Sequence, residues 1–365
     1  MKTFRIVTLP GDGIGPEVVA ETLRVLRAVG EATGFGLEVS EHLIGGAALD
    51  ATDDPFPAVT AEACLAADAV LMGAVGGPKW DHFTGSKRPE SGLLALRKTL
   101  GTFANLRPVS VPAALAASSP LREERVTGTD MLIVRELTGG IYFGEPRGRH
   151  AAEAGRWAEN TMVYDEQEIA RIAHVAFTWA RRRRNKVTLV DKANVLVVSQ
   201  LWREVVAEVH EASYADVEYD LLYVDNAAMQ VVINPRQFDV VVTSNLFGDI
   251  LSDLAATLPG SLGMLPSASV GGKVGLFEPV HGSAPDIVGE GKANPLATML
   301  SGVMMLEELG EQAAAEAIRA GIDDVLEDNC RTRDMWQEGQ QLVTTREMGQ
   351  RVIEKVTQRL ARVPA

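Results

Sequence analysis

Two aspartates near the start of a predicted helix give the sharpest chemical signal in the sequence. Asp249 and Asp253 stand four residues apart, so the helix expected near 250–258 would carry both carboxylates on one face. Two hard oxygen donors at this spacing suit Mg²⁺ or Mn²⁺. From the pair alone, an equally good interpretation is that the positive end of the helix dipole favours both aspartates. Asp225 follows the predicted strand 217–224 and is a third candidate ligand, because strand ends in open α/β sheets often bind ligands.

Three arginines are candidates for binding carboxylate groups. Arg135 ends the predicted strand 131–134, where a guanidinium could hold a carboxylate through paired hydrogen bonds. Arg107 follows Asn105 and could act in the same way. Arg97 lies in a predicted helix, and taken alone it is better interpreted as an exposed helical residue.

Three further residues have weak signals when each is considered separately. Lys192 follows the predicted strand 187–190 and resembles a catalytic lysine only in its position. Tyr142 lies in the middle of the predicted strand 141–143, where a tyrosine usually belongs to the core. His281 has no second histidine at ligand spacing, so it is not a metal candidate, although the glycines and prolines around it predict a rigid turn that could frame a ligand.

A glycine cluster near the N-terminus partly matches the dinucleotide-binding fingerprint. Gly11 and Gly13 have the right spacing, but Pro16 occupies the position of the third glycine in G-x-G-x-x-G. The segment also lacks the Gly-Lys-Ser/Thr ending of a phosphate-binding loop. A tight strand-to-helix turn is therefore the better interpretation of this segment alone.

Composition excludes several classes of protein. The chain has 365 residues, which suggests about two domains, and 35 Lys+Arg against 49 Asp+Glu give a formal net charge of -14. That charge argues against broad nucleic-acid binding, and the basic run 181–184 is explained by the C-terminal turn of a helix. Apolar runs stay below the ~18 residues of a membrane span, and two cysteines fit a reducing compartment. We therefore expect a soluble, cytoplasmic protein.

Strands are predicted to alternate with helices along most of the chain. This pattern predicts a layered, doubly wound α/β architecture with a subsidiary domain. We expect strands at 4–9, 69–72, 131–134, 141–143, 187–190, 217–224 and 240–243, helices at 165–184, 195–211, 250–258, 296–309, 313–326 and 347–360, and a loop at 262–275.

Taken together, the motifs resemble those of the decarboxylating β-hydroxyacid dehydrogenases, the isocitrate/isopropylmalate dehydrogenase family. The likeness covers nearly the whole chain, and its blocks stand in the family's order. They are the segments 9–17, 76–81, 88–94, 105–108, 134–147, 191–195, 245–253 and 278–286. One such block would be weak evidence, but the ordered set is highly specific and reverses several of the separate interpretations above.

The resemblance implies a role for each candidate residue. Asp249 and Asp253 would bind Mg²⁺ or Mn²⁺ together with Asp225 from a partner subunit, and a divalent cation would stabilise the enolate that decarboxylation produces. Lys192, also from the partner, would be the general base, and Tyr142 would be the acid that protonates the enol carbon. The substrate carboxylates would be held by Arg97, Arg107 and Arg135, with Asp225 also close to the substrate.

Within the family, the segment 90–94 implies the substrate. Leu93 and Leu94 resemble the floor of a pocket for an isopropyl group, with Val195 contributing from the partner, whereas isocitrate dehydrogenases carry polar residues in this stretch. The implied reaction is oxidation of 3-isopropylmalate by NAD with loss of CO₂, giving 4-methyl-2-oxopentanoate in leucine biosynthesis. The alternatives are a related enzyme acting on tartrate, malate or homoisocitrate, and an inactive nucleotide-binding scaffold of the same fold.

The resemblance also implies NAD rather than NADP as the cofactor. Asp286 would accept hydrogen bonds from the adenosine ribose, and its charge would repel a 2′-phosphate; NADP-using relatives tend to carry Lys and Tyr at this position and at Ile287. His281 and Asn294 would contact adenine, and Glu90 would lie on the nicotinamide side. The remaining implied cofactor residues are Glu278, Gly282, Ser283, Ala284 and Pro285.

The implied fold has two domains and is not a standard Rossmann domain. Residues 1–107 and 259–365 would form the cofactor-side domain, and 108–258 the domain for dimerisation, metal and substrate. An arm near 144–157 would embrace the partner. Because Lys192 and Asp225 would act across the interface, we expect a homodimer with shared active sites, without nucleic-acid or membrane partners.

Overall fold

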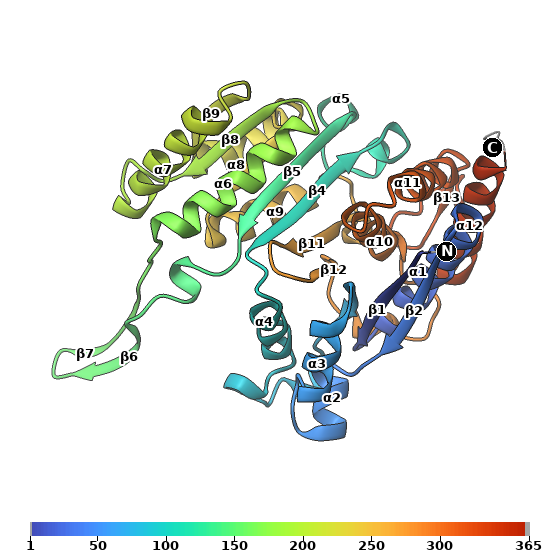
Figure 1. Cartoon of the computed structure of the whole chain (residues 1–365), viewed down its shortest axis with the longest axis horizontal. Coiled ribbons are helices and arrows are strands. Elements are labelled where there is room, and N and C mark those ends of the chain that lie inside the picture. The colour runs from blue at the N-terminus through green and yellow to red at the C-terminus, as the bar shows by residue number, and fades with distance from the viewer. Residues whose placement is uncertain (1, 362–365) are drawn as a thin grey trace. The chain divides into compact units, whose positions relative to one another are not determined.

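The computed structural model describes residues 2–361 and divides the chain into two compact units (Figure 1). Unit 1 comprises Met1–Thr102, Pro112–Ser118 and Pro259–Ala365, and unit 2 comprises Phe103–Val111 and Ser119–Leu258. The expected boundary between 107 and 108 differs from this division. Strand β4 (Ala104–Val111) pairs along its whole length with β5 (Thr129–Glu136), and a strand cannot be cut without losing those hydrogen bonds.

The main sheet strands of unit 1 lie in the order β2-β1-β3-β12-β11. Strands β2 (Phe35–Glu41), β1 (Lys2–Gly11), β3 (Ala69–Ala74) and β12 (Gly275–Pro279) run parallel, and β11 (Pro266–Val270) runs antiparallel to β12. The loop predicted over 262–275 is therefore wrong at β11. Its serines and alanine have little strand propensity, so pairing with β12 and burial determine its conformation.

The helices of unit 1 cover both faces of these strands. The connection from β1 leads to β2 on one side of β1, and the next connection leads back to β3 on the other side. Because such connections are right-handed, their helices lie on opposite faces of the strands. One layer contains α1 (Gly15–Thr33), α10 (Leu296–Glu308), α11 (Gln312–Glu327) and α12 (Thr345–Leu360). The other contains α2 (Gly45–Thr52), α3 (Ala58–Ala66) and α4 (Pro89–Leu100). The short strands β13 (Cys330–Arg331) and β14 (Gln341–Leu342) pair separately.

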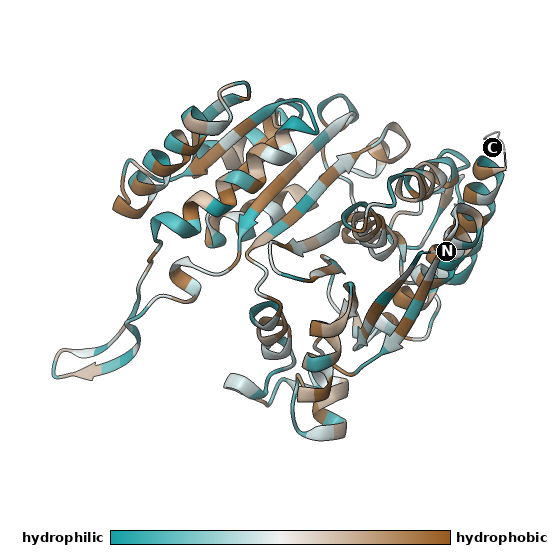
Figure 2. Cartoon of the chain, viewed as in Figure 1, coloured by the Kyte–Doolittle hydropathy of each residue, from teal (hydrophilic) through white to brown (hydrophobic). Residues whose placement is uncertain are grey.

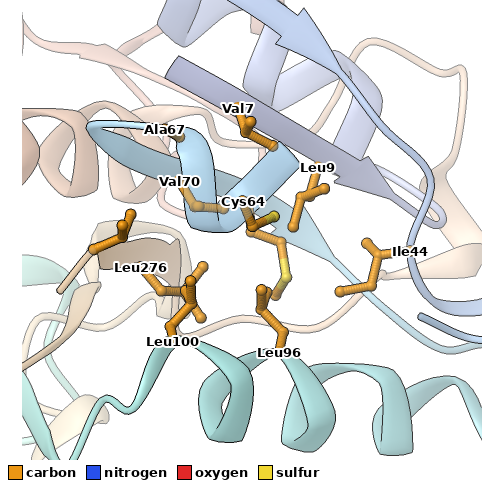
Figure 3. Close-up of a cluster of buried hydrophobic side chains, with 11 residues drawn as sticks. Val7, Leu9, Ile44, Cys64, Ala67, Val70, Leu96, Leu100 and Leu276 are labelled. Atoms are coloured by element: carbon orange, nitrogen blue, oxygen red, sulfur yellow. The ribbon is translucent and has the colours of Figure 1, made fainter. Parts of the chain in front are cut away.

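A cluster of buried apolar side chains fixes α4 in unit 1. Leu96 and Leu100 of α4 pack against strand residues that include Leu9, Val70 and Leu276 (Figure 3). This packing fixes the position of α4, which carries several candidate substrate residues, and leaves Leu94 of the same helix largely exposed.

The main sheet strands of unit 2 lie in the order β4-β5-β10-β8-β9. Strand β4 is antiparallel to β5, and β5, β10 (Val240–Thr243), β8 (Lys186–Asp191) and β9 (Glu218–Tyr223) are parallel. Crossover direction again separates the helices, with α6 (Glu166–Arg181) and α7 (Val197–Ser213) on one face and α8 (Val224–Ile233) and α9 (Asn245–Ala256) on the other. A short helix, α5 (Glu123–Val126), precedes β5. The predicted α/β class is thus confirmed.

The strand predicted at 141–143 is wrong. The chain there forms a 3₁₀ turn over Gly140–Tyr142, in which Gly140 has φ +78°. Three apolar residues in a row fit a strand and a turn equally well, so their pattern cannot decide between the two. A glycine with left-handed backbone angles favours the turn.

A two-stranded hairpin extends from unit 2. Strands β6 (Arg147–Ala152) and β7 (Gly155–Asn160) pair with each other, and most of their residues are exposed. Figure 2 shows hydrophobic residues concentrated along the central strands of each unit, whereas the hairpin is mixed. Among residues 2–361, no helix is long and apolar enough to cross a membrane.

Candidate active site

Helix α9 presents two aspartates on one face. Ser244 separates the end of β10 from the helix, which begins at Asn245. Asp249 and Asp253 follow in the helix, one turn apart. Both carboxylates contact arginines of two neighbouring strands, as expected for side chains on one face of the helix. Asp249 accepts a hydrogen bond from Arg135, and the Oδ1 atom of Asp253 lies 3.0 Å from Nη1 of Arg107.

The two arginines come from the antiparallel pair β4 and β5. Asn105 lies opposite Arg135 in the register, and Arg107 lies two residues further along β4. Arg135 is buried, and its Nε and Nη2 atoms donate to Oδ1 of Asn245 at 3.0 and 2.8 Å. Arg107 donates from Nε to Oδ1 of Asn105 at 2.8 Å. Both guanidinium groups are thus oriented by amide side chains as well as by carboxylates.

Tyr142 joins this cluster from the turn that follows β5. Its hydroxyl donates to Oδ2 of Asp249 at 2.8 Å, and the Arg135 guanidinium lies 5.9 Å from its ring centroid. Partial burial, followed by the hydrogen bond to the Asp249 carboxylate, raises the pKa of the Tyr142 hydroxyl. A tyrosine in this state holds its proton at neutral pH and can deliver it to a strong base. The core position expected for Tyr142 on its own is therefore not observed.

Lys192 and Asp225 form a separate pair in unit 2. Lys192 directly follows β8, Asp225 lies in the first turn of α8, and Nζ of Lys192 is 2.7 Å from Oδ1 of Asp225. This hydrogen bond to the ammonium group lowers the pKa of the Asp225 carboxyl. Val195, three residues after Lys192, is 67% exposed. Part of the predicted strand 217–224 is helix, because α8 already begins at Val224.

The candidate metal ligands fit the chemistry of a hard divalent cation. Asp249 and Asp253 offer carboxylate oxygens on one helix face, and neither side chain is fully buried. Within the described part of the chain, however, no group of three His, Cys, Asp or Glu residues could hold a metal ion. Asp225 is thus not brought to the other two aspartates within one chain.

Helix α4 of unit 1 carries the candidate substrate residues of the segment 90–97. Leu93 packs partly against the buried cluster, whereas Leu94 is largely exposed. Arg97 is mostly buried and donates from Nη2 to Oε1 of Glu278 at 2.7 Å. An arginine expected to bind the substrate and a glutamate expected to bind the cofactor therefore form one ion pair. The exposed interpretation of Arg97 alone is wrong.

The loop after β12 carries most of the predicted cofactor residues. Its Ser283 carbonyl accepts the backbone N–H of Ile14 at 2.9 Å, and a Cβ atom on Gly13 would lie 2.0 Å from that carbonyl oxygen. Ala284 and Ile287 pack against a small cluster that contains Ile14. The glycine-rich turn near the N-terminus thus supports this loop, a contact that sequence reasoning missed. Asp286 and Gly282 of the loop are exposed.

His281 and Asn294 have defined orientations in the same unit. Nδ1 of His281 lies 2.9 Å from the Gly282 carbonyl oxygen, so this nitrogen carries the hydrogen and Nε2 is an acceptor. Nε2 is buried and has no hydrogen-bond partner among the described residues. Burial lowers the pKa of His281, which keeps the ring neutral. The Asn294 amide donates to Asp334 at 3.0 Å and accepts from the Leu296 backbone at 3.1 Å.

The structure thus brings part of the predicted site together. One cluster in unit 2 consists of Arg107, Arg135, Tyr142, Asp249 and Asp253, and the Lys192–Asp225 pair stands apart from it. In unit 1, Glu90, Leu93, Leu94 and Arg97 share α4, and Glu278, 281–287 and Asn294 surround the end of β12 and the start of α10.

Comparison with known proteins gives one consistent family. A family model described as isocitrate/isopropylmalate dehydrogenase matches residues 5–352. A 3-isopropylmalate dehydrogenase of Salinibacter ruber is 64% identical over 351 residues, covering 96% of this chain and 95% of that protein. A 3-isopropylmalate dehydrogenase of Aquifex aeolicus is 54% identical over 357 residues and covers 98% of each.

Solved structures of similar proteins agree with the sequence matches. An isocitrate dehydrogenase from Methylococcus capsulatus superimposes with a TM-score of 0.83 at 36% identity, covering 97% of this chain and 99% of that one. A β-decarboxylating dehydrogenase from Thermococcus kodakarensis gives a TM-score of 0.82 at 34% identity, covering 98% of each chain. The predicted fold class is confirmed by these likenesses.

Proposed function

The chain belongs to the isocitrate/isopropylmalate dehydrogenase family, and from this premise we propose that it oxidises and decarboxylates 3-isopropylmalate with NAD, in leucine biosynthesis. The products are 4-methyl-2-oxopentanoate, CO₂ and NADH. The observation that carries the proposal is the cluster of Arg107, Arg135, Tyr142, Asp249 and Asp253. It combines groups that bind carboxylates, groups that bind a cation and a proton donor.

Binding of the substrate falls to the arginines. Arg107 and Arg135 are held by amide side chains in fixed orientations, so they are suited to bind the substrate carboxylates through paired hydrogen bonds. Leu94 is the exposed leucine of α4 and would contact the isopropyl group, whereas Leu93 mainly supports it. This assignment favours an apolar substituent over a third carboxylate, because an unpaired carboxylate beside leucines costs several kcal/mol.

The proton transfers fall to Lys192 and Tyr142. As a hydride leaves C2 of the substrate, Lys192 in its neutral amine form would take the hydroxyl proton. As the C3–carboxyl bond then breaks and releases CO₂, its electron pair remains at C3, where Tyr142 delivers a proton. The contact of the Tyr142 hydroxyl with Asp249 supports this role, because it keeps a protonated hydroxyl within the cluster that would bind the substrate. We assign Lys192 and Asp225 to a site completed by a second copy of the chain, a homodimer in which the β6–β7 hairpin embraces the partner.

The cation and the dinucleotide supply what these side chains lack. Mg²⁺ or Mn²⁺, held by Asp249, Asp253 and Asp225 of the second copy, would supply positive charge at the C2 oxygen, and NAD⁺ would accept the hydride. The loop 281–287 with Asp286 would hold the adenosine part, the neutral His281 would offer an acceptor nitrogen to adenine, and Glu90 would lie near the nicotinamide. A negative charge on Asp286 disfavours the 2′-phosphate of NADP.

The test is the appearance of NADH absorbance when 3-isopropylmalate, Mg²⁺ and NAD are added to the purified protein. We expect turnover that stops with a chelator, returns with excess Mg²⁺, and falls strongly with NADP. A panel of malate, tartrate and homoisocitrate separates the related activities. Faster turnover of one of those acids would replace the substrate assignment, and absence of turnover with every acid would favour the inactive scaffold.

A further inference from the structure

Tyr164 connects the three segments that carry the cluster in unit 2. It lies between β7 and α6 and is 6% exposed, with its ring edge-on to Trp202 at a centroid distance of 5.2 Å. Its hydroxyl oxygen accepts the backbone N–H of Asn245, the first residue of α9, at 2.9 Å. The Glu136 carboxylate at the end of β5 is near enough to this hydroxyl for its charge to add to burial in raising the pKa of Tyr164. None of the motifs that predicted the site includes Tyr164.

The hydrogen bond to Asn245 fixes the start of α9 and the orientation of Arg135. The backbone of Asn245 is held by Tyr164, while its side-chain oxygen accepts two hydrogen bonds from Arg135 at 3.0 and 2.8 Å. Asp249 lies one turn further along the same helix. Displacement of the first residue of α9 would therefore move both the arginine clamp and the aspartate.

Glu136 and the ring of Tyr164 together fix the turn that carries Tyr142. Glu136 is fully buried, and its carboxylate accepts the backbone N–H groups of Thr138 and Gly139 at 2.8 Å each. A Cβ atom on Gly139 would lie 2.5 Å from the Tyr164 ring, so the turn rests directly on this tyrosine. The Tyr164 ring and hydroxyl thus define where the turn can lie.

The hydroxyl keeps its donor role over the whole working pH range. Burial, and then the charge of Glu136, raise the pKa of Tyr164. The protonated hydroxyl accepts the Asn245 N–H through its oxygen and still carries a hydrogen of its own.

We propose that Tyr164 is a positioning residue: its buried hydroxyl aligns Arg135, Tyr142 and Asp249 for substrate and metal. This inference rests on the proposed function for its substrate, but it concerns a residue that touches neither substrate nor cofactor. Removing the hydroxyl leaves the buried N–H of Asn245 without its partner, and this N–H can regain one only if the start of α9 shifts.

The test compares Tyr164→Phe with the matched control Tyr214→Phe. Tyr214 is also buried in unit 2, and its hydroxyl lies 3.1 Å from His174 Nδ1 and 3.3 Å from Thr178 Oγ1, which are not candidate site residues. We expect both variants to lose a few degrees of melting temperature. Only Tyr164→Phe should raise the KM for 3-isopropylmalate, by about tenfold, while the KM for NAD stays within about twofold.

A binding measurement makes the test independent of turnover. Electron paramagnetic resonance of free Mn²⁺, in the presence of 3-isopropylmalate and absence of NAD, should show weaker Mn²⁺ binding by Tyr164→Phe than by Tyr214→Phe. Equal KM values and equal Mn²⁺ binding in the two variants would overturn the positioning role. If the wild-type protein does not turn over 3-isopropylmalate, the proposed function fails, and the Mn²⁺ titration alone decides the role of Tyr164.

A second variant covers the case in which Tyr164→Phe does not fold. Glu136→Gln keeps the size of the side chain and one carbonyl oxygen but removes the charge that the tyrosine hydroxyl faces. We expect the same direction of change in KM and Mn²⁺ binding, and wild-type values in a folded Glu136→Gln protein would contradict the proposal.

Discussion

Leucine 94 allows the substrate assignment to be tested without disturbing the fold. Its side chain is 52% exposed, whereas its neighbour Leu93 packs against the buried cluster of unit 1. At roughly 0.8 kcal/mol per buried carbon, the three outer carbons of a leucine are worth about 2.4 kcal/mol in full contact. Because about half of Leu94 is already covered within the chain, contact with an isopropyl group can add about half of this, near 1.2 kcal/mol. Leu94→Ala should therefore lower the preference for 3-isopropylmalate by about eightfold.

The assay measures kcat/KM for 3-isopropylmalate and for malate from NADH absorbance. Malate lacks the isopropyl group, so its kcat/KM reports any general damage to the site and serves as the internal reference. The ratio of the two constants should fall about eightfold in Leu94→Ala while the melting temperature stays near that of the wild type. Leu93→Ala should lose several degrees of melting temperature, because it removes packing from the buried cluster.

Two results would refute this reasoning. A ratio within about twofold of the wild-type value in Leu94→Ala would show that Leu94 does not contact the substituent. An equal fall of both constants with an unchanged ratio would show that the substitution damages α4 rather than the pocket.

Three further predictions concern separate parts of the site. Glu278→Gln should cost about 1–2 kcal/mol of unfolding free energy, because the mostly buried Arg97 loses its charged partner but keeps an acceptor. Glu124→Gln, which breaks the exposed Arg122–Glu124 pair, should cost almost nothing in the same denaturant titration. Burial holds the pKa of His281 below its usual value, so the unfolded chain binds more protons than the folded one once the pH falls below about 6.5. Wild-type stability should therefore drop on acidification by more than that of His281→Gln, and parallel curves in a pH series would contradict this. Lys192→Met should lower kcat by about 10²–10⁴-fold with substrate binding retained by titration, and a normal kcat would remove Lys192 as the base.

The sequence predicted the elements that have strong periodicity and missed those that depend on partners. The alternation of strands and helices was sufficient for the α/β class. Strand β11 was missed because Ser267, Ala268 and Ser269 carry no strand signal and are held by pairing with β12. The turn at Gly140–Tyr142 was misassigned because three apolar residues fit either conformation.

The site residues were predictable only where they fall in short motifs. Asp249 and Asp253 follow from helical spacing, but nothing in the spacing of residues shows that Asn245 orients Arg135 or that Tyr164 supports Asn245. Those contacts join segments far apart in the chain, and a single sequence carries no signal for them. Asp225 could not be placed for a different reason, since one chain does not bring it to the aspartates of α9.

The pairing of charges in the cluster explains how an acidic chain can bind an acidic substrate. Arg135 is paired with Asp249 and Arg107 with Asp253, so the four side chains together carry no net charge. A dicarboxylate that approaches this cluster gains from the arginines but is repelled by the aspartates at the same short range, and surface charges beyond about 8–10 Å are screened. A cation of charge about +2 on the aspartates, the charge that Mg²⁺ or Mn²⁺ would bring, would offset this repulsion. A divalent cation bound by these aspartates would thus help to bind the substrate, in addition to stabilising the electrons released by decarboxylation.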